Sequence, residues 1–357
     1  MKIRVNNQSF INFDSVTIDS MLDSVASVFS ISAFFDVDNP EHQIIFKPLS
    51  YNKIEIFDDE NQLLLTGVIL NHNFDAKSTT ELIEISGYSL PGVIEDCNVP
   101  HSMYPLESLK MNLGEIAKKF IEPFGLQLII DSSVSKEANL VYAKTVCEPE
   151  DSIKDYISKL AAQRNIILSH TKEGHLLMFR PNVKSNSKIL FSEQNTTSMT
   201  LSINGQGIHS QLTVLRQPKM KKEKTIKQKS STNGFEVIKE RPKSQFFDTV
   251  KNEMVGSFRP SVKKMTEGED VSTESAVKNL ISDELRNIKF TINLDRWEPL
   301  QPGDIIDLES RRLFLNKKVK LMIESISRNQ NSTSKTMNIN AVLPETFTGE
   351  LPKNIFL

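Results

Sequence analysis

The fold is decided by a stretch that occurs twice, first as Phe46-Lys47-Pro48-Leu49-Ser50-Tyr51-Asn52-Lys53-Ile54-Glu55-Ile56-Phe57 and later as Trp297-Glu298-Pro299-Leu300-Gln301-Pro302-Gly303-Asp304-Ile305-Ile306-Asp307-Leu308. Both copies open with an aromatic residue and a Pro-Leu pair, pass through a turn and enter a strand pattern. Two more strand patterns follow, and the copies end at Leu90-Pro91 and Leu343-Pro344, so that their lengths differ by two residues. A shift by an even number of residues leaves each side chain on the same face of a strand, so the same positions can point inward in both copies. The pattern therefore indicates a duplicated antiparallel β unit.

The entry of each copy supplies the candidate anchors of its core. They are Phe46, Pro48 and Leu49 in the first copy, and Trp297, Pro299 and Leu300 in the second. Trp297 is the only tryptophan, and Phe46 occupies the matching place, so we interpret both rings as core anchors at a strand entry.

Composition limits the classes of protein. A chain of 357 residues is long enough for two to four domains with ample core, so stability requires neither disulfides nor a metal. Cys97 and Cys147 are the only cysteines, which argues against a cysteine-rich zinc site and fits a reducing cytoplasm. No window reaches the roughly 18 apolar residues of a membrane span, so we expect no membrane insertion. With 43 basic and 45 acidic residues, the surface as a whole does not attract nucleic acid.

Periodicity predicts a β-rich α+β protein. Residues 1–100 alternate as strands, with Asp58 to Asn61 as a hairpin turn and a short helix expected over 19–29. Residues 101–182 form an inserted α+β domain, with helices expected near 113–121 and 153–161. The second β domain comprises 183–216 plus 288–347. Residues 217–287 are a lysine-rich excursion followed by a helix over 272–287, and 348–357 are a C-terminal tail.

No catalytic, cofactor-binding or metal-binding residue is identified, and no cofactor is expected. The sequence contains no Gly-x-Ser-x-Gly motif and no phosphate-binding Gly-x-x-x-x-Gly-Lys-Ser/Thr motif. No two histidines lie four apart with a glutamate between them, and we expect the six histidines to have solvated or packing roles. A carboxylate pair for sugar hydrolysis stays open, because its spacing is set in three dimensions.

The lysine run is the sharpest electrostatic feature. It comprises Lys219, Lys221, Lys222, Lys224, Lys227 and Lys229, opposed by one glutamate. Such a run can contact an acidic protein face or a phosphate backbone, although no aromatic residue is interleaved for base stacking. We favour a plain solvated loop and keep the partner contact as the alternative.

Three stretches resemble the baseplate hub proteins of contractile phage tails, in particular the Mu-like hub family, which is related to the hub part of type VI secretion spikes. The first runs from Glu148-Pro149-Glu150-Asp151-Ser152 to Arg164-Asn165-Ile166-Ile167-Leu168 and on to Glu173-Gly174-His175-Leu176. The second runs from Arg259-Pro260 through Glu284-Leu285-Arg286 to Trp297-Glu298-Pro299-Leu300. The third is the strand pair 319–326 and 337–343, followed by Pro344-Glu345-Thr346-Phe347.

The resemblance implies a fold and a function. The fold has two tube-like antiparallel β-barrel domains, an inserted α+β domain and a helical insertion. Three chains form a homotrimer that joins the sixfold tail tube to the threefold spike, since a duplicated domain supplies both symmetries. The implied partners are the tail tube protein, the central spike protein and other baseplate proteins, with DNA passing through the channel without specific binding. The implied location is the virion tail baseplate, assembled in the host cytoplasm.

Two other classes of function stay open beside this structural, non-enzymatic role. One is a tail-associated cell-wall hydrolase, which the many carboxylates allow. The other is a nucleic-acid-binding module that uses Lys219 to Lys229.

Overall fold

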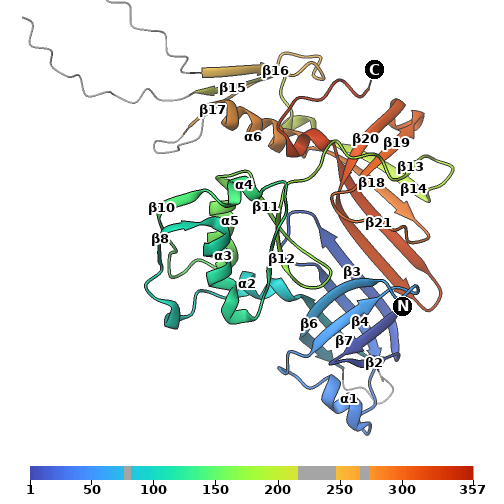
Figure 1. Cartoon of the computed structure of the whole chain (residues 1–357). Coiled ribbons are helices and arrows are strands. Elements are labelled where there is room, and N and C mark those ends of the chain that lie inside the picture. Colours follow the sequence, from blue (N-terminus) through green and yellow to red (C-terminus); the bar gives the residue numbers. More distant parts are fainter. Residues whose placement is uncertain (76–81, 216–246, 266–272, 357) are drawn as a thin grey trace, which may run out of the picture. The chain divides into compact units, whose positions relative to one another are not determined.

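The computed structural model describes residues 1–75, 82–215, 247–265 and 273–356 (Figure 1). The chain divides into two compact units. Unit 1 comprises Met1–Leu201 and Lys289–Pro344, and unit 2 comprises Ser202–Ile288 and Glu345–Leu357.

The N-terminal part of unit 1 is a set of antiparallel strands with one short helix. Its elements are β1 (Lys2–Val5), β2 (Gln8–Phe10), β3 (Phe13–Met21), β4 (Val28–Phe34), α1 (Pro40–Ile45), β5 (Lys53–Phe57), β6 (Leu63–Phe74) and β7 (Leu82–Ser89). Alternate side chains of β5 are buried, as its period-two pattern predicts. The turn expected after β5 is present, with the Asp58 carboxylate accepting the backbone N–H groups of Glu60 and Gln62.

The C-terminal part of unit 1 repeats this organisation. Its strands are β13 (Leu190–Phe191), β14 (Ser198–Ile203), β18 (Ile288–Leu294), β19 (Ile305–Ser310), β20 (Leu315–Asn331) and β21 (Lys335–Val342). The sheet order β14-β18-β21-β20-β19-β13 matches β3-β4-β7-β6-β5-β1, and both sets follow the chain in the same order. One difference is that β13 runs parallel to β19, whereas β1 runs antiparallel to β5.

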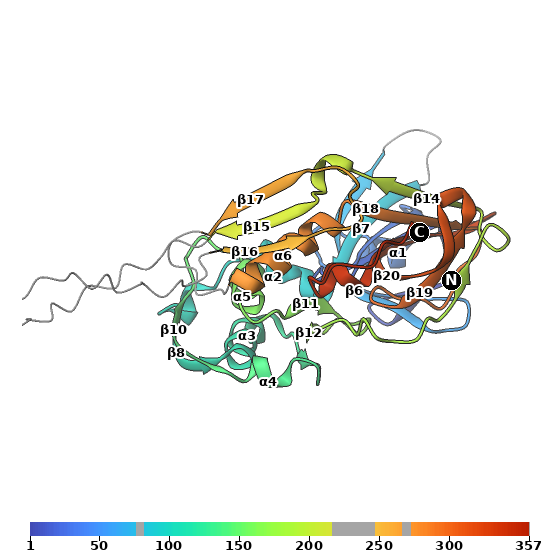
Figure 2. The same ribbon diagram turned by 90° about the horizontal axis from the view of Figure 1, so that it is seen from above.

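The expected pair of closed β-barrels is not observed in the described part of the chain. Both strand sets belong to one open sheet of 13 strands, because β20 pairs with β3 as well as with β19 and β21. The physical reason is length: β20 has 17 residues, so it extends beyond its neighbour β19 and offers a free edge to the other set. Figure 2 shows the same elements turned by 90°.

The helix expected over 19–29 is wrong. These residues are the end of β3, a turn and the start of β4. The apolar side chains do have helical spacing, but Met21 and Val28 are 47% and 49% exposed while Phe29 is buried. Strand alternation, continued by buried Val16 and Ile18, overrides the local helical pattern.

The inserted α+β part of unit 1 has its own core. Its elements are α2 (Val93–Asp96), β8 (Glu107–Asn112), α3 (Leu113–Ile121), β9 (Leu128–Ile130), α4 (Ser135–Ala138), β10 (Val141–Val146), α5 (Ile153–Ala162), β11 (Ile167–His170) and β12 (Leu176–Phe179). The two longer predicted helices are confirmed, and their expected apolar faces are buried. A capping box between Asn112 and Glu115 begins α3.

The described residues of unit 2 combine a small sheet with one α-helix. Its elements are β15 (Gln211–Leu215), β16 (Phe247–Lys251), β17 (Pro260–Lys264) and α6 (Thr273–Leu285), with sheet order β16-β15-β17. The helix predicted over 272–287 is therefore confirmed, and Val277, Ile281 and Leu285 of its predicted stripe are buried. Among the described residues of the whole chain, no helix is long and apolar enough to span a membrane.

His170, at the end of β11, joins the inserted part to the N-terminal strands. Its Nδ1 lies 2.9 Å from the Ser24 carbonyl oxygen, and its Nε2 lies 2.6 Å from Ser27 Oγ. A carbonyl only accepts, so Nδ1 carries the proton that is donated to Ser24, and Nε2 lies against the Ser27 hydroxyl. Burial lowers the pKa of His170 below its ordinary value of 6.5.

This joint predicts a loss of stability in acid. As the pH falls below about 6.5, the unfolded chain takes up a proton at His170 before the folded chain does, so the free energy of unfolding decreases. We expect His170→Asn to flatten this part of the pH dependence. Denaturant titrations between pH 5 and 8 measure it, with the exposed His101→Asn as control. An unchanged pH dependence in His170→Asn contradicts the assignment.

Candidate assembly interface

The two strand sets of unit 1 meet where β20 lies beside β3, and we name this contact the internal joint. Its pairs run from Ser325 opposite Met21 to Asn331 opposite Ser15. The Thr17 hydroxyl donates to Asn329 Oδ1 at 2.7 Å across the joint. Backbone pairing and a side-chain bond together make this contact specific.

A bulge positions the internal joint. Opposite β21, the ladder of β20 shifts register between Ile323 and Ser325, so Glu324 is the extra residue. The carbonyl of Glu324 accepts the N–H of Leu22, at the end of β3, at 2.9 Å. The bulge therefore marks the point where β20 leaves β19 and takes β3 as its neighbour.

Strand β6 has the same bulge in the same place. Its ladder with β7 shifts between Ile69 and Asn71, so Leu70 corresponds to Glu324. The preceding turns also match: Ile69 N–H donates to the Asn52 carbonyl, and Ile323 N–H donates to the Asp304 carbonyl, both at 3.0 Å. Beyond the bulge, however, no described strand pairs with β6 on the side of β5.

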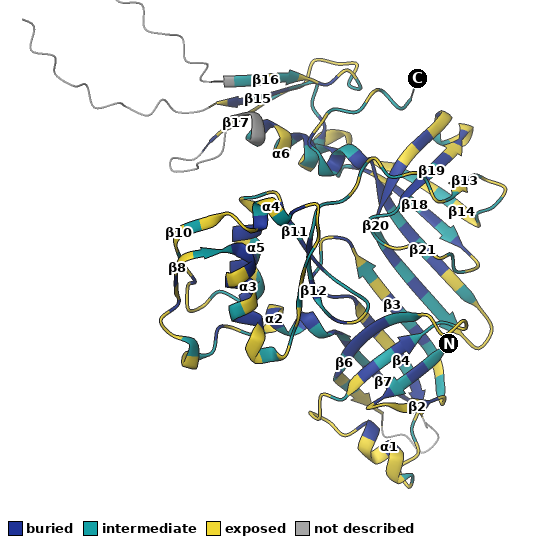
Figure 3. Cartoon of the chain, viewed as in Figure 1, coloured by how far each residue is buried: buried dark blue, intermediate teal, exposed yellow. Residues whose placement is uncertain are grey.

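A second free edge lies on β14, the counterpart of β3. Within the described residues β14 has β18 as its only neighbour and ends the sheet. Met199 and Leu201 are half-buried and Ile203 is 47% exposed, whereas Val16 and Ile18 of β3 are 1% exposed. Figure 3 colours each described residue by its burial. Unit 1 therefore has two unpaired edges of the same two kinds that meet in the internal joint.

The anchors of the two copies are buried differently. Phe46 is 1% exposed in an aromatic cluster, with ring centroids 5.3 Å from Phe10 and 5.9 Å from Phe35. Leu49 is 75% exposed with a backbone φ of 59°, and Pro48 is exposed as well. Leu49 is therefore not a core residue of this chain, because helix α1 carries Phe46 inward and the turn carries Leu49 outward.

The second copy reverses this arrangement. Leu300 is 1% exposed, while Trp297 is half-buried and Pro299 is exposed. The indole Nε1 donates to the Thr336 carbonyl at 2.8 Å, and Lys335 Nζ lies 4.4 Å from the ring centroid. Trp297 thus packs beside the start of β21, and leucine takes over the role of core anchor.

The turn after Leu300 packs against the first strand set. Gly303 has a φ of 92°, and a Cβ placed there would lie 3.0 Å from Leu22 Cδ1. The Arg328 guanidinium donates to the Leu300 carbonyl from β20. Burial of Leu300 thus coincides with the internal joint, whereas Leu49 has no such neighbour.

The predicted lysine contact and the question of a metal site do not concern this interface. All six lysines of the candidate partner contact, 219 to 229, lie outside the described residues. In the part of the chain that is described, no group of three or more acidic, histidine or cysteine residues is placed to hold a metal.

Sequence reasoning missed the Ser27–His170 pair, which lies 143 residues apart in the chain. A serine 2.6 Å from a histidine has the geometry of a nucleophile and its base. However, Ser27 is 4% exposed, its Oγ also lies 2.7 Å from Ser20 Oγ, and its N–H donates to Ser89 Oγ. The pair is embedded in the joint of the inserted part, and no local motif signals it.

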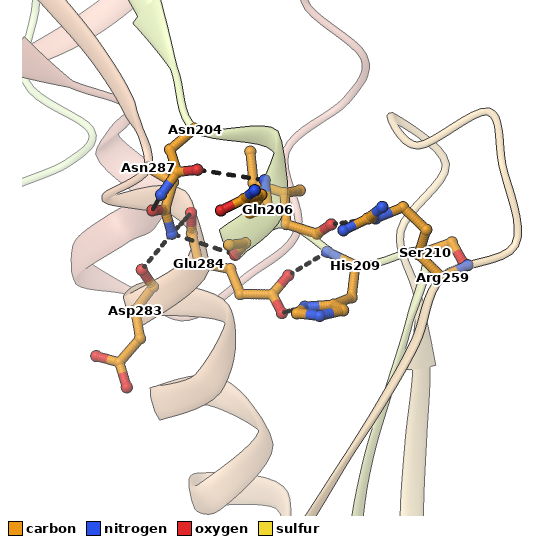
Figure 4. A network of polar contacts seen from close by, with 10 residues as sticks. Asn204, Gln206, His209, Ser210, Arg259, Asp283, Glu284 and Asn287 are labelled. Atoms are coloured by element: carbon orange, nitrogen blue, oxygen red, sulfur yellow. Dashed lines mark hydrogen bonds and ion pairs between the residues drawn. The ribbon is translucent and has the colours of Figure 1, made fainter.

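A polar network in unit 2 fixes helix α6 to the segment before β15 (Figure 4). Glu284 accepts the backbone N–H of His209 at 3.0 Å and lies 2.6 Å from its Nδ1. The Asn287 carbonyl accepts from Asn204 N–H at 3.0 Å, and Arg259 N–H donates to Ser210 Oγ at 2.7 Å. These bonds hold structural elements of unit 2 together.

The whole chain is similar to solved phage tail proteins. The 43 kDa tail protein of prophage MuSo2 from Shewanella oneidensis matches with a TM-score of 0.73 at 14% identity, over 98% of this chain and 99% of that one. A tail protein from Neisseria meningitidis MC58 matches with a TM-score of 0.72 at 16% identity, over 98% and 97% of the two chains. An E. coli component of the type VI secretion system matches with a TM-score of 0.59 at 9% identity, over 99% and 80%.

These similarities show the fold. No protein-family model matches the chain. No curated protein matches it by sequence. The chain therefore has the fold of prophage tail proteins, including its inserted part and both strand sets.

The unequal anchors predict unequal costs of truncation. Phe46→Ala removes a fully buried ring and should lower the free energy of unfolding by about 3 to 5 kcal/mol. Leu49→Ala removes an exposed side chain and should cost less than about 0.5 kcal/mol in the dissociated chain. Denaturant titration at low protein concentration measures both. Equal losses contradict the reversal of the anchors.

Proposed function

We propose that this chain is a structural baseplate hub of a contractile phage tail or a related injection particle. The observation that carries the proposal is the fold shared with two prophage tail proteins over nearly the full length of all three chains. The likeness to a type VI secretion component fits the same class, because that component is itself structurally similar to T4 bacteriophage tail proteins. The role is structural, without turnover.

The repeated strand order supports a duplicated module. Two sets of six strands share their order in the sheet and along the chain, and corresponding bulges fall at Leu70 and Glu324. Independent strand sets have no reason to share a bulge, whereas a duplicated one does. We therefore divide the chain into tube-like domains over 1–100 and 183–216 plus 288–347, with the inserted domain, the lysine-rich excursion with its helix, and the tail as before.

Three such chains make a ring with both symmetries. In a homotrimer, three copies of two equivalent modules give six positions around one axis, which suits a threefold spike below and a sixfold tube above. The tail tube protein, the central spike protein and other baseplate proteins are the partners in this proposal. DNA passes through the ring without specific binding, and the location is the virion tail baseplate, assembled in the host cytoplasm.

The free edges define how the ring closes. In the internal joint, the end of β20 pairs with β3. The corresponding contact between chains pairs the end of β6 with β14 of the next chain. This contact covers both free edges and removes two sites of uncontrolled strand pairing.

The register of the contact between chains follows from the ladders. The bulges align Asn329 with Asp75. The Asn204–Asn287 backbone bond and the Ser198–Asn293 side-chain bond set Leu201 opposite Phe290, as Ile18 lies opposite Phe29. By this alignment Thr200 takes the place of Thr17.

The Thr17–Asn329 hydrogen bond therefore has a counterpart between chains, from the Thr200 hydroxyl to the Asp75 carboxylate. A hydroxyl donates to an amide oxygen and to a carboxylate alike, so the chemistry of the pair is kept. Leu49, the counterpart of buried Leu300, becomes covered in the same step.

Disulfide trapping tests the ring. We expect Asp75→Cys with Thr200→Cys to give covalent dimers and trimers on oxidation, since opposite Cβ atoms lie roughly 5 Å apart across a strand pair. Denaturing electrophoresis without reductant resolves the products. Before oxidation, light scattering should give three times the 40.5 kDa chain mass.

The internal joint supplies the matched control. Thr17→Cys with Asn329→Cys should form a disulfide within one chain and leave its mass unchanged. Each single variant shows the background from Cys97 and Cys147. A wild-type chain that stays monomeric at high concentration, with no covalent trimer from the 75/200 pair, rules out the ring.

The hydrolase alternative has its own test. Zymography on peptidoglycan should show no clearing by the wild-type chain. Clearing that Ser27→Ala or His170→Asn abolishes would overturn the non-enzymatic role.

A further inference from the structure

Arg328, on β20, is a buried cation that has no direct counterion among the residues that the structure describes. Its side chain is 8% exposed, and its guanidinium makes one hydrogen bond, to the Leu300 carbonyl. A guanidinium has five N–H donors, and buried charges in proteins are normally paired. The other four donors have no acceptor among the described residues, and since none of these nitrogens is a fully buried atom without a partner, they are open to water or a ligand.

The two acids that attract Arg328 are engaged elsewhere. Asp304 binds Lys188 at 2.8 Å and accepts the Gln301 N–H at 2.7 Å. Asp58 accepts two backbone N–H groups of its own turn. Burial lowers the pKa of Arg328 to about 10, against the attraction of both acids, so the guanidinium stays charged at neutral pH. The attraction of the two acids thus offsets only part of the free-energy cost of burying the charge of Arg328.

The guanidinium borders a cavity of about 460 Å³ within unit 1. The cavity lies where the two strand sets and the inserted part meet, and its walls include the hydroxyl-bearing Ser20, Ser89 and Thr171. Lys172 adds a second cation to the lining. This volume falls in the range of small-molecule sites.

One carboxylate also lines the cavity. Glu173 is exposed, and a hydrogen bond from Thr171 lowers its pKa. Its charge faces His175 and Lys172. Glu173 and Lys172 offset each other, and His170, whose pKa burial lowers, is neutral at pH 7, so the lining keeps one net positive charge, that of Arg328.

We propose that this cavity binds a small organic anion, whose phosphate or carboxylate group pairs with Arg328 and accepts from the surrounding hydroxyls. Guanidinium groups bind both oxyanions through two parallel N–H donors. The bound anion bridges the two strand sets and the inserted part. The site goes beyond the proposed hub role, since it is complete within one chain.

Calorimetry and thermal unfolding of the full chain test the site, with inorganic phosphate and acetate as probes and chloride at matched ionic strength as reference. We expect phosphate, acetate or both to bind and to raise the unfolding temperature above the chloride reference. The stronger of the two arms identifies the class of oxyanion. Heat and unfolding temperature equal to the chloride reference in both arms overturn the proposal.

Variants assign the binding to Arg328. Arg328→Met should weaken the favoured probe at least tenfold, as expected when a buried charge partner is removed. Arg328→Lys should bind the probe with an affinity between those of the wild type and Arg328→Met, because lysine keeps the charge but lacks the two parallel N–H donors of a guanidinium. Lys144→Gln, an exposed lysine away from the cavity, should bind as the wild type does.

Two outcomes contradict this assignment. One is unchanged affinity in Arg328→Met and Arg328→Lys. The other is a wild-type chain that neither probe stabilises, together with an Arg328→Met chain that is more stable than the wild type. Replacing a tolerated buried charge by an apolar side chain often increases stability in this way. If Arg328→Met fails to fold, Arg328→Lys and Lys172→Gln decide, and wild-type affinity in both overturns the site. None of these measurements depends on trimer formation.

Discussion

The organisation of unit 1 depends on the pairing of one long strand. β20 has 17 residues, and a strand carries unsatisfied N–H and C=O groups along any edge that lacks a neighbour. β21 covers one edge from Met322 to Gln330, whereas on the other edge β19 covers only the first half, from Leu315 to Met322. The second half takes β3, and this single contact makes one sheet of two strand sets. The internal joint is therefore a consequence of strand length and of a bulge that turns the strand past its shorter neighbour.

The internal joint also explains where polar groups are buried. Three parts of the chain meet beside it, and their backbones cannot all be paired by regular ladders. His170 and Ser27 satisfy one gap, and Arg328 holds the Leu300 carbonyl at another. Such groups cost free energy unless every donor finds an acceptor. In the folded chain this free-energy cost arises at Arg328, whose guanidinium is only partly hydrogen-bonded and borders a cavity.

Local patterns in the sequence predict much of this structure. Helices α3, α5 and α6 follow from their apolar spacing, and the hairpin of β5 and β6 follows from its turn residues. The helix expected near residue 22 fails, because apolar spacing alone does not separate a helix from two strands and a turn. The exposure of Leu49 and the burial of Leu300 also escape prediction, since each depends on a neighbour far away in the chain.

The interface itself is harder to predict, for a physical reason. Strand partners are chosen largely by backbone groups that every residue carries, and the Thr17–Asn329 bond between β3 and β20 cannot be recognised from the sequence of either strand alone. A sequence can show a duplication, because two copies of one pattern can be recognised without knowing which strands pair. The doubling of Phe46 and Trp297 pointed to the two sets, although the rings themselves do not have equivalent roles.

The paired and unpaired edges differ in how far their side chains are exposed. A joint inside one chain forms during folding, so both sides can be apolar, as Val16, Ile18 and Ile326 are. An edge that pairs only with a second chain is exposed to water before assembly, and a long apolar edge promotes aggregation. Beyond its bulge, β6 carries exposed Asn71 and Asn73. β6 also exposes Phe74 and β14 exposes Ile203, so the unpaired edges differ from the internal joint in exposure rather than in polarity. Duplicated modules that keep one joint inside the chain and one between chains are expected to diverge in this way, with the same backbone geometry and exposed side chains where assembly comes later.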